Sequence, residues 1–189
     1  MTAFLRGLAA MVAALILGGT AMAADPENTL YLDTVYGRVV ITMKPDLAPN
    51  HVKQIKELTR KGFYDGVPFH RVIDGFMAQT GDPTGTGAGP GSGHKLKGEF
   101  SSERHVRGIV SMARTSDPDS ADSQFFIMLG SAPSLDGKYT IWGEVESGME
   151  FVDKIKKGEQ ARNGAVSNPD KIVKMQVAAD AAKSGGKGK

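Results

Sequence analysis

Cysteine is absent from the 189 residues of the sequence, and its absence excludes several classes of protein at once. There can be no disulfide bridge, no thiolate metal site, no cysteine nucleophile and no lipid anchor on a cysteine. A domain of about 150 residues does not need such a crosslink, because it buries roughly 68–70% of the surface that its unfolded chain exposes. We therefore expect a hydrophobic core to hold the fold together.

Long basic runs and long apolar segments are also missing. Lysine and arginine number 23 against 21 aspartate and glutamate residues. No five basic residues follow one another, so the sequence does not predict a nucleic-acid partner. The longest uninterrupted apolar run, Leu8 to Leu17, has ten residues, whereas a helix that spans a bilayer needs about 20.

This apolar run belongs to a segment with the pattern of an export signal. Arg6 precedes it, two glycines follow it, and Ala21-Met22-Ala23 then matches an Ala-x-Ala cleavage site. The pattern predicts that residues 1–23 are a signal peptide cleaved after Ala23. The alternative, an uncleaved membrane-anchoring helix, is disfavoured by the short apolar length. We expect an exported mature protein without stable membrane association.

Short β-rich segments dominate the rest of the chain. Thr29 to Thr34 and Arg38 to Met43 flank Tyr36-Gly37 and predict a hairpin. Further short strands are expected over Ile109–Ala113, Ser123–Met128, Tyr139–Val145 and Lys171–Val177. Many short strands with few helices argue against a parallel βαβ sheet and favour an antiparallel barrel.

Two amphipathic helices are expected. The first runs from Pro49 to Gly62 and the second from Gly148 to Lys157. Their apolar faces consist of Val52, Ile55 and Leu58 in the first helix and Met149, Val152 and Ile155 in the second. Small residues, glycines and lysines predict a disordered basic tail over residues 179–189. Residues 24–178 then form one domain.

The strongest functional signal is a set of motifs in a fixed order. They are Phe69-His70-Arg71-Val72-Ile73 leading into Gly75–Asp82, the glycine loop Gly85–Gly91, Gly108–Arg114, Ser123-Gln124-Phe125-Phe126-Ile127, and Leu135–Tyr139 followed by Trp142–Val145. In this order and spacing the chain resembles the cyclophilin-type peptidyl-prolyl cis–trans isomerases over residues 29–177. An Ala-Arg-Thr segment followed by an Asp/Pro/Ser-rich stretch resembles the bacterial exported branch, for which the periplasm is the natural location.

The resemblance implies a fold and an activity. The expected fold is mainly β, a closed eight-stranded antiparallel β-barrel capped by two α-helices. The expected reaction is rotation about X–Pro bonds of exported proteins, which crosses a barrier of about 18–20 kcal/mol because rotation breaks amide resonance. A fixed donor aimed at the prolyl nitrogen of the twisted amide lowers that barrier. Arg71 suits this role, because its guanidinium is always charged and rigid.

The resemblance also implies the site residues. The catalytic set is Arg71, Gln79 and Phe76. The substrate-binding set is His70, Met77, Ala113, Arg114, Gln124, Phe126, Leu135 and Tyr139. No cofactor is expected, and no metal, because the other histidines lack ligand spacing. The partners are proline-containing unfolded or partly folded polypeptides, and we expect a monomer.

Other interpretations of these residues remain open. The aromatic side chains could all be core, but if Phe126 faces a groove then Phe125 faces the core, because strand side chains alternate. His70 is not expected to be a base, because isomerisation transfers no proton. The groove could also serve a non-catalytic proline-binding or chaperone module, although pure binding does not require Arg71.

Three positions depart from the usual family pattern. Ser134 stands where eukaryotic members typically have a tryptophan that helps bind cyclosporin, so we expect weak binding of the drug. Tyr139 stands where many members have histidine, and Arg114 where many have asparagine. These two departures bear on substrate preference rather than on activity.

Overall fold

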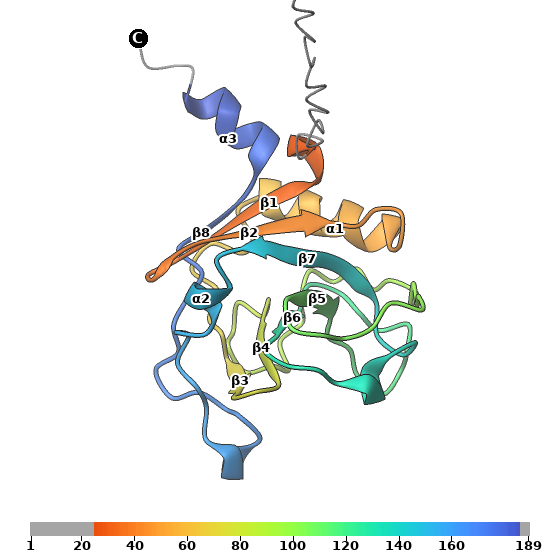
Figure 1. Ribbon diagram of the computed structural model, residues 1–189, viewed down its shortest axis with the longest axis vertical. Helices are drawn as coiled ribbons and strands as arrows, with labels where there is room; N and C mark the ends of the chain where they lie inside the picture. Colours follow the sequence, from red (N-terminus) through yellow and green to blue (C-terminus); the bar gives the residue numbers. More distant parts are fainter. Residues whose placement is uncertain (1–24, 186–189) are drawn as a thin grey trace, which may run out of the picture.

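A computed structural model describes residues 25–185 (Figure 1). Its strands are β1 (Thr29–Thr34), β2 (Gly37–Met43), β3 (Arg71–Ile73), β4 (Met77–Thr80), β5 (Ile109–Met112), β6 (Phe125–Met128), β7 (Ile141–Ser147) and β8 (Lys174–Val177). The helices are α1 (Pro49–Arg60), α2 (Met149–Val152) and α3 (Ala178–Gly185), with short 3-10 turns η1 (Pro26–Asn28), η2 (Pro133–Leu135) and η3 (Gln160–Arg162). The predicted signal peptide, residues 1–23, lies outside the described residues.

All eight strands join one antiparallel sheet in the order β3-β4-β6-β5-β7-β2-β1-β8. The predicted hairpin is confirmed as β1 and β2, paired from Thr29 with Thr42 to Thr34 with Gly37. The sequence analysis assigned no strands at β3 and β4. They are only three and four residues long, too short for a readable alternation.

The predicted closure of the barrel is wrong, because the sheet is curled but open between β3 and β8. The segments that precede β3 and β8 do contact each other. The Gly66 amide donates to Ile172 O at 2.8 Å, and the Phe69 amide donates to Asp170 O at 2.9 Å. Between Gly66 and Phe69, Pro68 forms an isolated antiparallel bridge with Lys171. The Ile172 amide also donates to Val67 O at 2.9 Å, but this pairing does not extend into β3 and β8.

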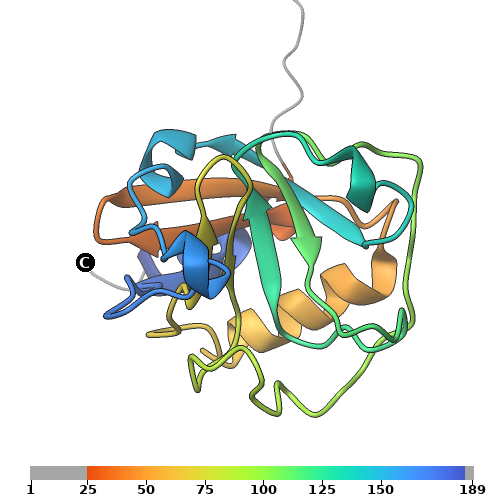
Figure 2. The ribbon, with the colours of Figure 1, turned by 90° about the horizontal axis from the view of Figure 1, so that it is seen from below.

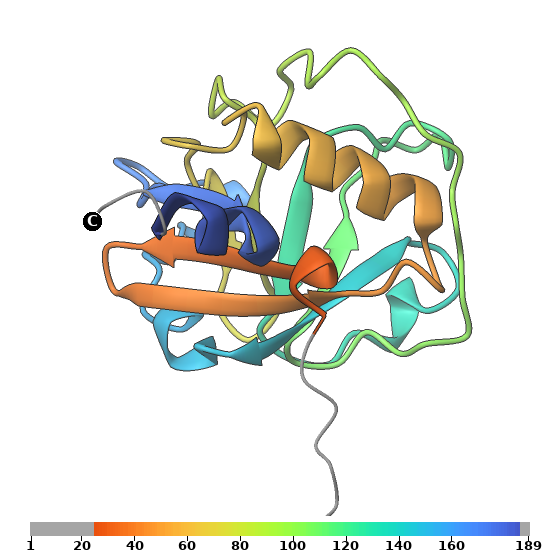
Figure 3. The same cartoon turned by 90° about the horizontal axis from the view of Figure 1, so that it is seen from above.

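Helix α1 packs beside β8 against the curled sheet (Figures 2 and 3). Its predicted apolar face is confirmed: Val52, Ile55 and Leu58 are all buried. Pro49 opens the helix, where its missing amide hydrogen costs nothing. Among the described residues, no helix has both the length and the apolar character to cross a membrane.

The other two helices differ from the expectation. The predicted helix over 148–157 is only the single turn α2, after which Lys154 and Ile155 donate to carbonyls three residues back. Val152 and Ile155 are nevertheless buried, so the predicted face was right and the length wrong. The predicted disordered tail begins instead as α3, which lies beside η1 and β1 (Figure 3).

Two apolar clusters lie on opposite faces of β4, β6 and β5. The main core contains Phe125, whose ring meets that of Trp142 edge-on at 5.4 Å. The smaller cluster contains Phe126 and Met77. The predicted alternation of Phe125 and Phe126 is therefore confirmed, and the second cluster leaves room for a surface pocket.

Candidate active site

A surface pocket of about 110 Å³ lies over the second apolar cluster. The residues that line it, which we call the Arg71 pocket, are Arg71, Phe76, Met77, Gln79, Ala113, Arg114, Phe126, Leu135 and Tyr139. All of them belong to the predicted site. They come from segments far apart in the sequence, which the sheet brings together.

The strand register explains why these side chains meet. Arg71 on β3 stands opposite Gln79 on β4, Gln79 stands opposite Phe126 on β6, and Phe126 stands opposite Ser111 on β5. Directly opposed residues of antiparallel strands share a face, with Cβ atoms about 4.5–5.5 Å apart. One row across four strands therefore carries the cation, an amide, an aromatic ring and a hydroxyl.

Neutral oxygen atoms hold the Arg71 guanidinium. Its Nε donates to Asn163 O at 3.0 Å, Nη2 to Asn163 Oδ1 at 3.0 Å and Nη1 to Gln79 Oε1 at 3.2 Å. Burial lowers the pKa of Arg71, but an arginine stays charged at physiological pH. The charge is thus fixed in position and not cancelled by a carboxylate.

Asn163 is a site residue that the sequence analysis missed. It ends η3 with a φ of 54°, in the left-handed region that asparagine tolerates. Gly164 follows with a φ of 78°, and a Cβ there would lie 2.4 Å from Ile73 Cγ1. The Asn-Gly pair is a turn signal, but nothing in it points to a residue 92 positions earlier.

A chain of amides extends the support of Arg71. Gln79 Nε2 donates to Gln124 Oε1 at 3.0 Å, and Gln124 Nε2 donates to Gly87 O at 3.2 Å. Gln124 therefore does not line the pocket but orients Gln79. The Gly87 amide is in turn held by Asp82 Oδ2 at 2.8 Å.

The Asp82 carboxylate anchors the glycine loop Gly85–Gly91 through hydrogen bonds. This carboxylate accepts hydrogen bonds from the Thr84 hydroxyl and from the amides of Thr84, Gly87 and Gly89. Burial alone raises the pKa of Asp82, but these hydrogen bonds outweigh burial and lower the pKa to about 2. The loop is thus tied to a carboxylate that stays ionised.

His70 lies outside the pocket, contrary to its predicted place among the substrate-binding residues. It is buried, and its ring lies close enough to Gly87 that a Cβ on that glycine would be 3.2 Å away. Burial lowers the pKa of His70, while the Asp82 charge and the Pro68 carbonyl act in the opposite direction. The structure makes it a packing residue beneath the glycine loop.

A buried histidine stands behind the aromatic wall of the pocket. The His105 ring is stacked on Phe126 with centroids 6.4 Å apart, and Phe126 meets Tyr139 edge-on at 6.0 Å. His105 Nδ1 lies 3.1 Å from Asp136 Oδ1, and Nε2 lies 3.1 Å from Ser111 Oγ. The sequence analysis weighed the other histidines, His105 among them, only as metal ligands, rejected that role for lack of ligand spacing, and missed this support.

The order Asp136, His105, Ser111 looks like a hydrolytic triad, but its burial excludes that chemistry. Ser111 is fully buried and lies 2.8 Å from Thr140 O, so a substrate carbonyl has no access to the hydroxyl. Burial lowers the pKa of His105, against the opposing effect of Asp136. The network positions the pocket wall.

Comparisons with known proteins agree with this geometry. A family model described as "Cyclophilin type peptidyl-prolyl cis-trans isomerase/CLD" matches residues 29–177. This protein is a cyclophilin. Like its family, it is a peptidyl-prolyl cis–trans isomerase.

Named relatives and solved structures support the assignment. A "Probable peptidyl-prolyl cis-trans isomerase" of Brucella suis is 54% identical over 185 residues, covering 91% of this chain and 94% of the relative. Cyclophilin AquaCyp293 from Hirschia baltica superposes with a TM-score of 0.74 at 31% identity, covering 83% of this chain and 76% of the other. A Cryptosporidium parvum cyclophilin, crystallised in the presence of the dipeptide Ala-Pro, gives a TM-score of 0.70 at 29% identity, with 79% of this chain and 98% of the other covered.

The tryptophan of this cyclophilin cannot replace the one missing at position 134. Trp142 is fully buried on β7 in the main core. Ser134 occupies η2, next to the pocket residue Leu135. Ser134 is exposed and is not among the residues that line the pocket.

Proposed function

We propose that the Arg71 pocket binds the substrate proline and that Arg71 is the residue that accelerates its isomerisation. The observation that carries this proposal is the position of a fixed, uncompensated guanidinium at the edge of an apolar pocket. Phe126, Met77 and Leu135 supply apolar surface for a pyrrolidine ring. Gln79 orients Arg71 and lines the same pocket.

The reaction requires electrostatic stabilisation only. As the X–Pro bond twists, the prolyl nitrogen loses amide resonance and becomes a better hydrogen-bond acceptor. Three of the five N–H groups of Arg71 are used by neutral oxygen atoms. A remaining donor can bind the prolyl nitrogen more strongly in the twisted state than in the planar one, which lowers the barrier.

The alternative of a non-catalytic proline-binding or chaperone module accounts for less of the geometry. Apolar walls alone hold a proline ring. The hydrogen bonds that hold Arg71 to Asn163 and Gln79 cost side-chain entropy. A site that bound proline through apolar contacts alone would not need this ordered cation. The oriented cation supports turnover.

The test is the rate of cis-to-trans conversion of a short prolyl peptide. Arg71→Ala should lower kcat/KM by about 100-fold or more, which is typical of losing one transition-state donor. Arg162→Ala is a matched control, because Arg162 is exposed and pairs with Glu159 outside the pocket. Equal rates for wild type and Arg71→Ala would overturn the role of Arg71. An inactive wild type that still binds the peptide would favour the binding module.

We further propose that the enzyme acts on proline-containing, unfolded or partly folded exported proteins in the periplasm, as a monomer released by cleavage after Ala23. The export pattern in residues 1–23 and similarity to bacterial relatives support this, and a neighbour crystallised with Ala-Pro supports the substrate class. We also expect weak cyclosporin binding, because Ser134 stands where eukaryotic members typically have a tryptophan that helps bind the drug. N-terminal sequencing of the periplasmic fraction should return Ala24; an intact N-terminus in the cytoplasm would contradict the location.

A further inference from the structure

Four of the five described arginines outside the Arg71 pocket form ion pairs, the exception being Arg104, whereas the two inside it form none. Among the described residues, Arg38, Arg60, Arg107 and Arg162 each form an ion pair with a carboxylate. Arg71 and Arg114 line the pocket and form no ion pair. The lining set contains these two cations and no acidic residue.

Arg114 is already held in one orientation. Its Nε and Nη2 donate to Lys138 O at 3.1 and 2.9 Å, and Nη1 donates to Thr115 O at 2.8 Å. The guanidinium carbon lies 4.3 Å from the centroid of the Tyr139 ring, which is a cation–π distance. All of these partners are neutral, so the charge is immobilised and remains uncompensated.

Three carboxylates that follow Arg114 in the sequence have other partners. Asp117 Oδ1 accepts the Asp119 amide at 2.9 Å, and Asp119 Oδ1 accepts the Gly98 amide at 3.0 Å. Asp136 accepts the His105 amide and faces the His105 ring. None of the three forms an ion pair with Arg114 among the described residues. A half-buried pocket with two cations attracts negative charge more strongly than an open surface does.

We propose that Arg114 determines substrate specificity, so that the enzyme prefers peptides with an aspartate or glutamate next to the proline. This proposal rests on the proposed function, because it requires that proline bind in the Arg71 pocket. The immobilised guanidinium loses little conformational entropy when a carboxylate binds. In this arrangement Arg71 faces the reacting amide, and Arg114, which stacks on Tyr139 in the same pocket lining, faces a neighbouring residue of the substrate.

The experiment compares peptides that differ only in charge. Glu-Pro, Gln-Pro and Lys-Pro peptides, and the corresponding Pro-Glu and Pro-Gln pair, are assayed at low and at high salt. Wild type should turn over a glutamate peptide about threefold faster in kcat/KM than its glutamine isostere, the range expected for a partly exposed charge pair. The preference should fall in high salt, because salt screens such pairs.

The variants identify the residue responsible. In Arg114→Gln the glutamate-to-glutamine ratio should fall to about one, in Arg114→Lys it should stay above one, and in the control Arg162→Gln it should equal that of wild type. A wild-type ratio of one at low salt at both positions, or an unchanged ratio in a folded Arg114→Gln, would overturn the proposal. The salt dependence of wild type tests it even if the variant does not fold. Absence of turnover on every peptide would instead count against the proposed function.

Discussion

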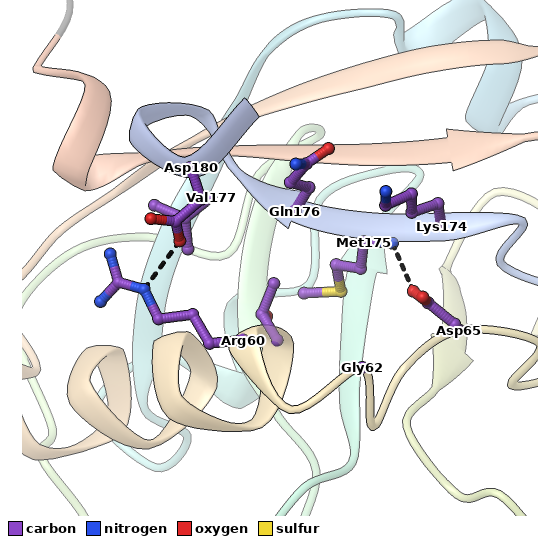
Figure 4. A pocket seen from close by; sticks show the side chains of 9 residues that line it. Arg60, Gly62, Asp65, Lys174, Met175, Gln176, Val177 and Asp180 are labelled. Atoms are coloured by element: carbon purple, nitrogen blue, oxygen red, sulfur yellow. Dashed lines mark hydrogen bonds and ion pairs between the residues drawn. The ribbon is translucent and has the colours of Figure 1, made fainter. Parts of the chain in front are cut away.

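Two surface hollows among the described residues differ in the partners of their arginines. The larger, of about 410 Å³, lies between α1, β8 and α3 and is the Arg60 hollow, lined by Thr59, Arg60, Gly62, Asp65, Lys174, Met175, Gln176, Val177 and Asp180. There Arg60 donates to Asp180 at 2.8 Å, and Asp65 accepts the Met175 amide (Figure 4). Arg60 also donates to Glu27 at 2.9 Å. In the Arg71 pocket both arginines bind neutral acceptors.

This difference shows that size does not indicate which hollow is the site. A guanidinium paired with two carboxylates has little attraction left for a substrate and serves to tie segments together. A guanidinium held by amides and carbonyls is equally well positioned but keeps its charge. The smaller pocket therefore has the electrostatic capacity for catalysis. The following predictions test this contrast, beyond those for Arg71 and Arg114.

The largest expected effect concerns Asp82. Its carboxylate accepts the Gly87 amide, and Gly87 in turn holds Gln124, which orients Gln79 in the Arg71 pocket. The folded pKa of Asp82, about 2, lies below the unfolded value of about 3.9. The resulting stabilisation is fully present above pH 4 and is lost as pH falls through the folded pKa. It amounts to about 2 kcal/mol.

Denaturant unfolding of wild type and Asp82→Asn at pH 5.5 and pH 2.5 measures this contribution. The free energy of unfolding of wild type should fall more steeply with acid than that of the variant, by about 2 kcal/mol. Parallel losses in both proteins would show that Asp82 does not anchor the loop through its charge.

The next prediction converts the Arg71 pocket toward the charge pattern of the Arg60 hollow. Asn163→Asp places a carboxylate 3.0 Å from Nη2 of Arg71, and aspartate tolerates the left-handed backbone at this position. Neutralising the guanidinium should lower kcat/KM by about tenfold, an effect of about 1.4 kcal/mol. Asn163→Gly is the control, because it removes the side-chain hydrogen bond to Nη2 without adding charge. If both variants lose equal activity, charge compensation is not what distinguishes the two hollows.

The smallest effect is expected at Arg60. Its ion pairs with Glu27 and Asp180 are partly exposed, with 41% of the arginine side chain accessible. Arg60→Ala should therefore reduce the free energy of unfolding by about 1 kcal/mol or less and leave isomerase activity unchanged. A large loss of activity in a folded Arg60→Ala protein would give the larger hollow a role in the reaction.

Local sequence patterns predicted a substantial part of the structure. The β1–β2 hairpin, the buried face of α1 and the opposite directions of Phe125 and Phe126 all follow from residue periodicity, which acts over a few neighbouring residues. The resemblance to cyclophilins supplied every residue that lines the pocket. In contrast, β3 and β4 are too short to carry a pattern, and α2 ends after one turn although its apolar spacing continues.

By itself, the sequence determined which residue types were present and which faces of the longer elements are apolar, because these depend on composition and local spacing. Only the tertiary structure decided that the sheet stays open between β3 and β8, that His70 lies under the glycine loop, and that Asn163 holds Arg71. Each of these depends on contacts between segments distant in sequence, which no local pattern records. The same holds for the neutral acceptors of the two pocket arginines, because Asn163 and Lys138 lie in other segments of the chain than Arg71 and Arg114.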